Sequence, residues 1–139
     1  MTNDSSPTEP VTKPEGKVIL IVEDDPVLLR MYTEKFTFEG FAVLTARDGE
    51  EALKVATDGH VDIILLDIML PKMSGTDFLE RLRKEVKGND VPVVALTNLA
   101  AQDEKEKALK LGAKEYLVKA MQTPEEVVEK IKDHLSKFK

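Results

Sequence analysis

The segment that decides the fold is residues 63–71, which read IILLDIMLP. Four apolar residues lead directly into the carboxylate of Asp67, and Pro71 marks a turn shortly afterwards. An apolar run of this length between turn residues is typical of a strand buried on both faces of a parallel sheet. Because an isolated buried carboxylate is costly, Asp67 should lie at the carboxyl edge of that sheet, where open α/β folds bind ligands.

Outward from this segment, three other apolar runs also end in polar side chains. The predicted strand at 17–22 is followed by Glu23, Asp24 and Asp25. The predicted strand at 91–96 is followed by Thr97, and the one at 115–118 by Lys119. The carboxyl ends of parallel strands meet at one edge of a sheet. We therefore expect acids, a hydroxyl and an ammonium group to converge there.

The remaining elements complete a βα alternation. A further strand is predicted at 41–46, and the buried run around Asp67 gives a strand at 62–66. Helices are predicted at 26–39, 49–58, 76–86, 102–111 and from 124 to the C-terminus, with N-caps at Asp25, Asp48 and Thr123. Five strands alternating with five helices predict an α/β fold with a doubly wound parallel sheet.

Composition limits the classes of function. The chain has 139 residues, no cysteine and a net charge of -6, which argues against nonspecific binding to nucleic acid or to an anionic membrane. Residues 1–16 contain three prolines and few apolar side chains, so we expect a disordered leader before a domain at 17–139. Without a signal-peptide pattern, the expected location is the cytoplasm.

The converging side chains suit phosphoryl chemistry. Asp25 is expected to cap the first helix, which leaves Glu23 and Asp24 to face Asp67. Crowded carboxylates are stabilised by a hard cation such as Mg²⁺, and a carboxylate can attack phosphorus to form an aspartyl phosphate. The chain has no Gly-rich phosphate loop, so the phosphoryl group should come from another molecule. Each of these residues, taken alone, could also have a purely structural role. Lys119, for example, could be an ordinary surface lysine.

Together these residues resemble the receiver domain of bacterial response regulators, in particular the single-domain chemotaxis type. Segment 67–75, DIMLPKMSG, resembles the phosphorylation loop of that family, and the likeness extends over 17–138. The resemblance implies a flavodoxin-like fold with strand order 2-1-3-4-5. It also implies a signalling switch of a two-component system, not an enzyme, with Mg²⁺ or Mn²⁺ as cofactor.

The resemblance assigns a role to each site residue. Asp67 would accept a phosphoryl group from a histidine kinase or a phosphotransfer protein. Asp24, Asp67 and the Met69 backbone carbonyl would bind the metal ion, and Glu23 would hold a metal-bound water. Lys119 would pair with Asp67 before transfer and with the phosphoryl group afterwards.

The same resemblance implies a switch. Thr97 would turn inward to hydrogen-bond the phosphoryl oxygens, and Tyr116 would follow it inward. The face formed by the fourth helix, the fifth strand and the fifth helix would then bind a downstream protein. The protein would be a monomer or a phosphorylation-dependent dimer, acting alone or as part of a longer regulator.

Two positions depart from the family pattern. Asn98 follows Thr97 where the family usually has a small residue, and Ala120 follows Lys119 where it usually has a cis proline. A cis bond before alanine costs about 2.5–4 kcal/mol, so a trans bond or a strained loop is expected. These departures leave open a scaffold that works without phosphorylation. A phosphatase with an aspartyl nucleophile is a weaker alternative, because its Asp-x-Asp pattern is absent after the first strand.

Overall fold

The computed structural model describes residues 16–85, 90–98 and 102–137. They form a five-stranded parallel sheet with the order β2-β1-β3-β4-β5. The strands are β1 (Val18–Val22), β2 (Ala42–Ala46), β3 (Ile63–Leu66), β4 (Val93–Thr97) and β5 (Ala113–Val118). The helices are α1 (Pro26–Phe38), α2 (Gly49–Asp58), α3 (Gly75–Glu85), α4 (Gln102–Lys110) and α5 (Pro124–Lys137), with a 3₁₀ turn, η1 (Lys119–Met121), before α5. The predicted flavodoxin-like α/β fold is confirmed.

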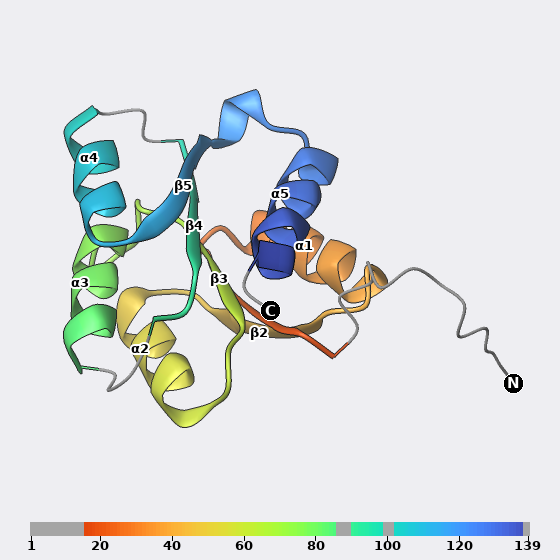
Figure 1. The fold of residues 1–139 in the computed structure, drawn as a ribbon, viewed down its shortest axis with the longest axis horizontal. Helices are drawn as coiled ribbons and strands as arrows, with labels where there is room; N and C mark the ends of the chain where they lie inside the picture. The colour runs from red at the N-terminus through yellow and green to blue at the C-terminus, as the bar shows by residue number, and fades with distance from the viewer. Residues whose placement is uncertain (1–15, 86–89, 99–101, 138–139) are drawn as a thin grey trace, which may run out of the picture.

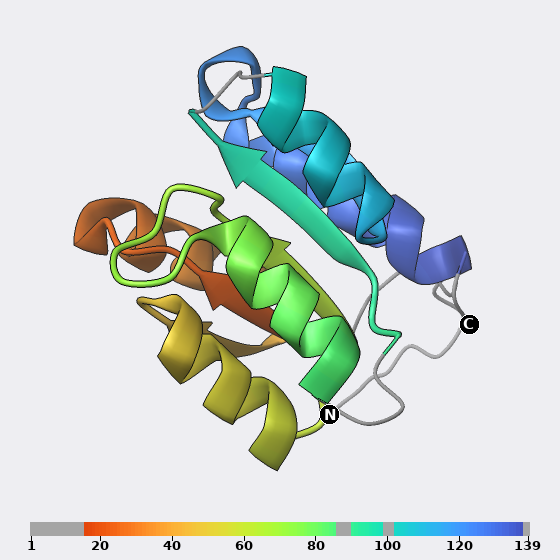
Figure 2. The ribbon, with the colours of Figure 1, turned by 90° about the vertical axis from the view of Figure 1, so that its left-hand side faces the viewer.

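Helices cover both faces of the sheet. Figure 1 shows α2, α3 and α4 on one side of the strands and α1 and α5 on the other, and Figure 2 views the first of these faces. Successive side chains of a strand point to opposite faces. In β1, Ile19 and Ile21 pack in the core under α1 and α5, whereas Leu20 and Val22 pack in the core under α2, α3 and α4. This explains why the strands read as continuous apolar runs.

The predicted N-caps of α2 and α5 are confirmed. Asp48 accepts a hydrogen bond from the Glu51 N–H at 2.8 Å. Thr123 and Glu126 form a reciprocal capping box, in which the Glu126 N–H donates to Thr123 Oγ1 at 3.1 Å and the Thr123 N–H donates to Glu126 Oε1 at 2.8 Å. These caps satisfy backbone groups that the first helical turn leaves without partners.

Three strands begin one residue later than predicted, and the starts of β4 and β5 differ from the prediction by two residues. β4 begins at Val93 instead of residue 91, because Pro92 has no N–H and cannot donate to the sheet. β5 begins two residues earlier than predicted, at Ala113, and an irregularity in its pairing falls between Val93 and Val94. A bulge of this kind interrupts the alternation from which a strand is read in a sequence.

Three of the predicted segments include residues outside the described ranges. Most of the predicted leader at 1–16, the end of the third predicted helix at Val86 and the last residues of the fifth lie outside the described residues. Within the described ranges, no helix has the length and apolar character needed to cross a membrane.

The topology decides where a ligand can bind. The first strand, β1, pairs with β2 on one side, and the chain then crosses to β3 on the other side of β1. Beyond the carboxyl ends of β1 and β3, the connecting loops therefore leave in opposite directions and open a crevice. Glu23 and Asp67 directly follow these two strands.

Candidate functional site

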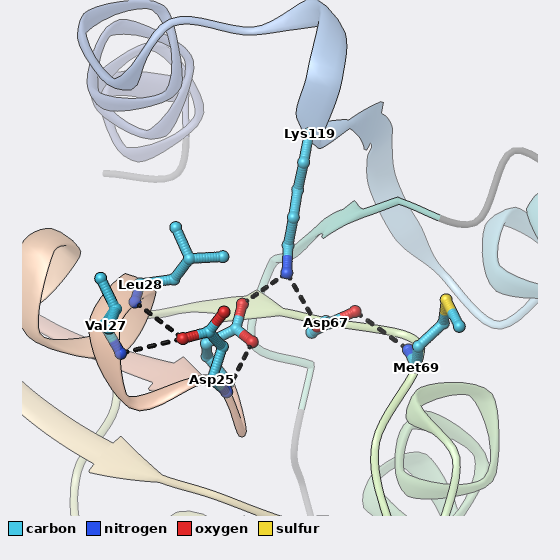
Figure 3. Close-up of polar contacts among 7 residues, drawn as sticks. Asp25, Val27, Leu28, Asp67, Met69 and Lys119 are labelled. Carbon is cyan, nitrogen blue, oxygen red and sulfur yellow. Dashed lines mark hydrogen bonds and ion pairs between the residues drawn. The ribbon is translucent and has the colours of Figure 1, made fainter.

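Asp67 lies at the carboxyl end of the central strand β3. Its N–H donates to the Val22 carbonyl oxygen at 3.0 Å, which extends the pairing of β1 and β3 by one residue. Only 5% of Asp67 is exposed. Its Oδ1 accepts a hydrogen bond from the Met69 N–H at 2.9 Å, as Figure 3 shows. The carboxylate is thus oriented from its own loop.

The acids after β1 divide between two tasks. Asp25 Oδ1 accepts hydrogen bonds from the N–H groups of Val27 at 2.9 Å and Leu28 at 3.3 Å, so Asp25 caps α1 as predicted (Figure 3). The Asp25 N–H in turn donates to Glu23 Oε2 at 3.0 Å. This bond holds Glu23 at the site, where only 5% of the residue is exposed.

Lys119 joins the two buried carboxylates. Its Nζ lies 2.7 Å from Glu23 Oε1 and 2.9 Å from Asp67 Oδ2. The lysine arrives from the end of β5 and reaches across β4 toward the other two side chains (Figure 3). Hydrogen bonds between ionised groups are short and strong, so these contacts tie three strand ends together. Pairing of Lys119 with Glu23 as well as Asp67 was not foreseen from the sequence.

Burial and pairing shift the pKa values of this cluster. Burial raises the pKa of Glu23 above its ordinary value, and the hydrogen bonds from Lys119 and the Asp25 N–H only partly offset this effect. Burial acts in the opposite direction on Lys119, but its hydrogen bonds to Glu23 and Asp67 outweigh it, and the pKa of Lys119 is raised. Lys119 therefore stays charged at neutral pH.

Three carboxylates at this edge can share a cation. Glu23, Asp24 and Asp67 each offer one oxygen, and these oxygens all lie within 4.8 Å of one another. Asp24 is the most accessible to solvent of the three. Carboxylate oxygens on a wet, acidic edge are the donor set that Mg²⁺ uses, since it keeps several of its waters. The residues present therefore fit a magnesium ion.

Thr97 and Tyr116 occupy neighbouring strands. Thr97 ends β4 and is fully buried, whereas Tyr116 lies half-buried on β5 and is paired in register with Ala95. Burial raises the pKa of Tyr116, with smaller contributions from the charges of Glu104 and Asp67. The charge of Asp67 therefore acts on this tyrosine.

The two departures from the family pattern lie at the rim of the site. Asn98 and Ala120 are both exposed. The described residues contain no cis peptide bond, so the trans bond expected before Ala120 is confirmed. Ala120 belongs to η1, the 3₁₀ turn that leads from Lys119 toward α5.

Gly75, the last residue of the segment 67–75, is required by close backbone packing at this position. Its N–H donates to the Ile68 carbonyl oxygen at 2.8 Å, which brings the start of α3 against the loop after Asp67. A Cβ at position 75 would lie 2.6 Å from Ile68 Cα and 2.7 Å from the Asp67 carbonyl oxygen. The only sequence signal was glycine itself, eight residues after the acid.

With this geometry described, comparisons with known proteins identify the family. The family model of the response regulator receiver domain matches residues 19–132. The chain belongs to this family. It is therefore a receiver domain of two-component signalling, a switch and not an enzyme, and the phosphatase alternative is set aside.

Curated relatives are longer proteins. The chain is 36% identical over 120 residues to a probable transcriptional regulator, ycf27, of Cyanidium caldarium, which covers 86% of this chain and 47% of that protein. It is 43% identical over 101 residues to the transcriptional regulatory protein CpxR of Klebsiella pneumoniae, covering 73% of this chain and 42% of that protein. The chain thus spans less than half the length of these relatives.

Solved structures share the whole fold. A CheY-like receiver domain protein from Methanospirillum hungatei has a TM-score of 0.82 at 32% identity, covering 88% of this chain and 96% of that one. The receiver domain of the sensor histidine kinase PA1611 from Pseudomonas aeruginosa has a TM-score of 0.77 at 30% identity, covering 87% and 98%. That structure has a magnesium ion coordinated in its active site cleft.

Replacing Gly75 by alanine should destabilise the protein. The new methyl group would meet backbone atoms, which cannot move aside as a side chain can, so we expect a loss of about 1–3 kcal/mol in the free energy of unfolding. Denaturant titration measures this loss. The control is Gly59→Ala, because a Cβ there would have its nearest contact at 3.4 Å. Equal stability of the two variants would contradict the close approach at Gly75.

The raised pKa of Glu23 predicts a pH dependence in metal-free buffer. The folded protein binds this proton more tightly than the unfolded chain. The stability contributed by Glu23 is therefore lost as the pH rises from the ordinary pKa of a glutamate through the raised pKa of the folded protein. Glu23→Gln should remove this part of the slope of unfolding free energy against pH. Glu129→Gln, an exposed change on α5, should keep the slope. An unchanged slope in Glu23→Gln would refute the assignment.

Proposed function

We propose that this receiver accepts a phosphoryl group on Asp67 in a reaction that depends on Mg²⁺, with Mn²⁺ as a substitute. The observation that carries the proposal is the buried Asp67 carboxylate with Lys119 Nζ at 2.9 Å, beside two further acids. A carboxylate at such a site is a nucleophile for phosphorus, and phosphoryl transfer needs cations to neutralise its oxygens. The metal ion would supply that neutralisation.

The other site residues complete this proposal. Asp24 and Asp67 bind the ion together with the Met69 carbonyl oxygen, and Glu23 holds a metal-bound water. Lys119 transfers its pairing from Glu23 and Asp67 to the new phosphoryl oxygens. Its raised pKa supports this role, because the group must carry its charge when the phosphoryl group arrives.

The proposed donor is a phosphohistidine on a histidine kinase or a phosphotransfer protein. In the transfer, the P–N bond breaks, its electrons return to the imidazole, and a P–O bond forms to Asp67. Three exposed apolar side chains adjoin the site and support a protein donor: Val27 is 74% exposed, Met69 54% and Met121 75%. Exposed apolar side chains around a polar centre are typical of protein interfaces.

The proposed output is a change at the face formed by α4, β5 and α5, which then binds a downstream protein. Tyr116 lies on β5 within the influence of Asp67, and Thr97 ends the neighbouring strand. A phosphoryl group adds about -1.5 to -2 charges, and a few kcal/mol of differential contact suffice to shift two conformations. The proposal includes a cytoplasmic protein, monomeric or dimeric on phosphorylation, with no contact to nucleic acid or membrane.

A second proposal is a receiver-like scaffold that binds its partner without phosphorylation. The observation in its favour is that Asn98 and Ala120 replace the small residue and the proline expected after Thr97 and Lys119. Both lie exposed at the mouth of the site, where a partner protein would meet them.

Incubation with acetyl phosphate and Mg²⁺ tests the first proposal. Intact-protein mass should show one added phosphoryl group on the wild type, and none on Asp67→Asn or without the metal ion. Asp133→Asn, an exposed change on α5, should be phosphorylated like the wild type. A wild type that binds Mg²⁺ but gains no phosphoryl group, from acetyl phosphate or from a phosphohistidine protein, would favour the scaffold.

A further inference from the structure

A pocket beside the phosphoacceptor loop connects the candidate site with α4. It has a volume of about 580 Å³ and lies where the loop after β3, the start of α3 and the start of α4 meet. Its lining includes Met69, Ser74, Thr76, Asp77, Glu104 and Lys107. Figure 2 shows α3 and α4 on the face of the sheet where this pocket opens. The pocket therefore joins a loop that carries the chemistry to a helix of the proposed output face.

Polar contacts cross this pocket from α3 to α4. Thr76 is only 2% exposed, and its hydroxyl donates to Glu104 Oε1 at 3.3 Å. Thr76 Oγ1 also lies 3.1 Å from Ser74 Oγ, and Ser74 caps α3 by accepting a hydrogen bond from the Asp77 N–H at 3.1 Å. The start of α3, a few residues after Asp67, is thus linked through one buried hydroxyl to α4.

The link is well placed to respond to charge at Asp67. Met69, whose N–H donates to Asp67 Oδ1 at 2.9 Å, and Glu104 line the same pocket. A phosphoryl group on Asp67 would add negative charge beside the loop that lines this pocket, and this charge would repel the Glu104 carboxylate. A single hydrogen bond makes a modest net contribution to stability, so a repulsive charge nearby can break it.

We propose that the Thr76–Glu104 hydrogen bond is a latch that holds α4 against the start of α3 in the resting protein and opposes phosphorylation of Asp67. Glu104 is then a positioning residue, since it acts through Thr76 and α4 without touching the phosphoryl group. This inference rests on the proposed function of Asp67. Linkage makes the effect reciprocal: phosphorylation weakens the latch, and opening the latch favours the phosphorylated conformation.

The test uses beryllofluoride as a non-covalent substitute for the phosphoryl group. Its dissociation constant is measured by calorimetry at saturating Mg²⁺ for wild type, Glu104→Ala, Thr76→Val and the double variant. Each single change should tighten beryllofluoride binding about fivefold. The double variant should bind no more tightly than the better single variant, because both changes remove one bond.

Two controls separate the latch from a general structural effect. Glu106→Ala removes an exposed acid from the same helix and should leave beryllofluoride binding unchanged. The dissociation constant for Mg²⁺ alone should stay within about twofold of the wild type in all variants, because the latch does not touch the metal ligands. Thermal unfolding followed by circular dichroism checks that Thr76→Val, a buried change, leaves a folded protein for the comparison with Glu104→Ala.

The outcomes distinguish this inference from the proposed function. A wild type that binds Mg²⁺ but not beryllofluoride would overturn the proposed function and the latch with it. A wild type that binds beryllofluoride, with Glu104→Ala and Thr76→Val no tighter, would overturn the latch alone. Additive effects of the two changes, or equal changes in Mg²⁺ affinity, would also overturn it.

Discussion

The structure depends on one ammonium group that two buried carboxylates share. Lys119 contacts Glu23 at 2.7 Å and Asp67 at 2.9 Å, and each of these two acidic residues is only 5% exposed. Removing one partner from such a cluster leaves an uncompensated buried charge, which typically costs 3–5 kcal/mol. Two negative charges against one positive charge also leave the cluster short of a cation. That deficit is the physical reason to expect a metal ion at this site.

The pairing and order of the strands bring these groups together. Parallel pairing places the ends of β1, β3 and β5 at one edge, and the crossing of the chain from β2 to β3 opens the crevice there. Asp25 faces away from the crevice because it caps α1. A carboxylate that accepts hydrogen bonds from the Val27 and Leu28 N–H groups cannot also reach Asp67. The site is therefore a consequence of topology and one cap.

Much of this could be predicted from the sequence, because it follows from local patterns. The apolar run before Asp67, the caps and the strand-end positions of the acids are all visible in order along the chain. The early start of β5 could not be predicted, since the pairing irregularity near Val93 hides its alternation. Nor could the contact of Thr76 with Glu104 or the backbone approach at Gly75, which depend on how elements pack in three dimensions.

The central claim is that Lys119 and Asp67 form an energetically coupled buried pair. A double-mutant cycle with Asp67→Asn, Lys119→Met and the double variant measures it, from unfolding free energies in metal-free denaturant titrations. We expect a favourable coupling energy of about 1–3 kcal/mol between the two side chains. A coupling energy indistinguishable from zero, with all four proteins folded, would contradict it and would leave Lys119 as a lysine that merely lies near the acids.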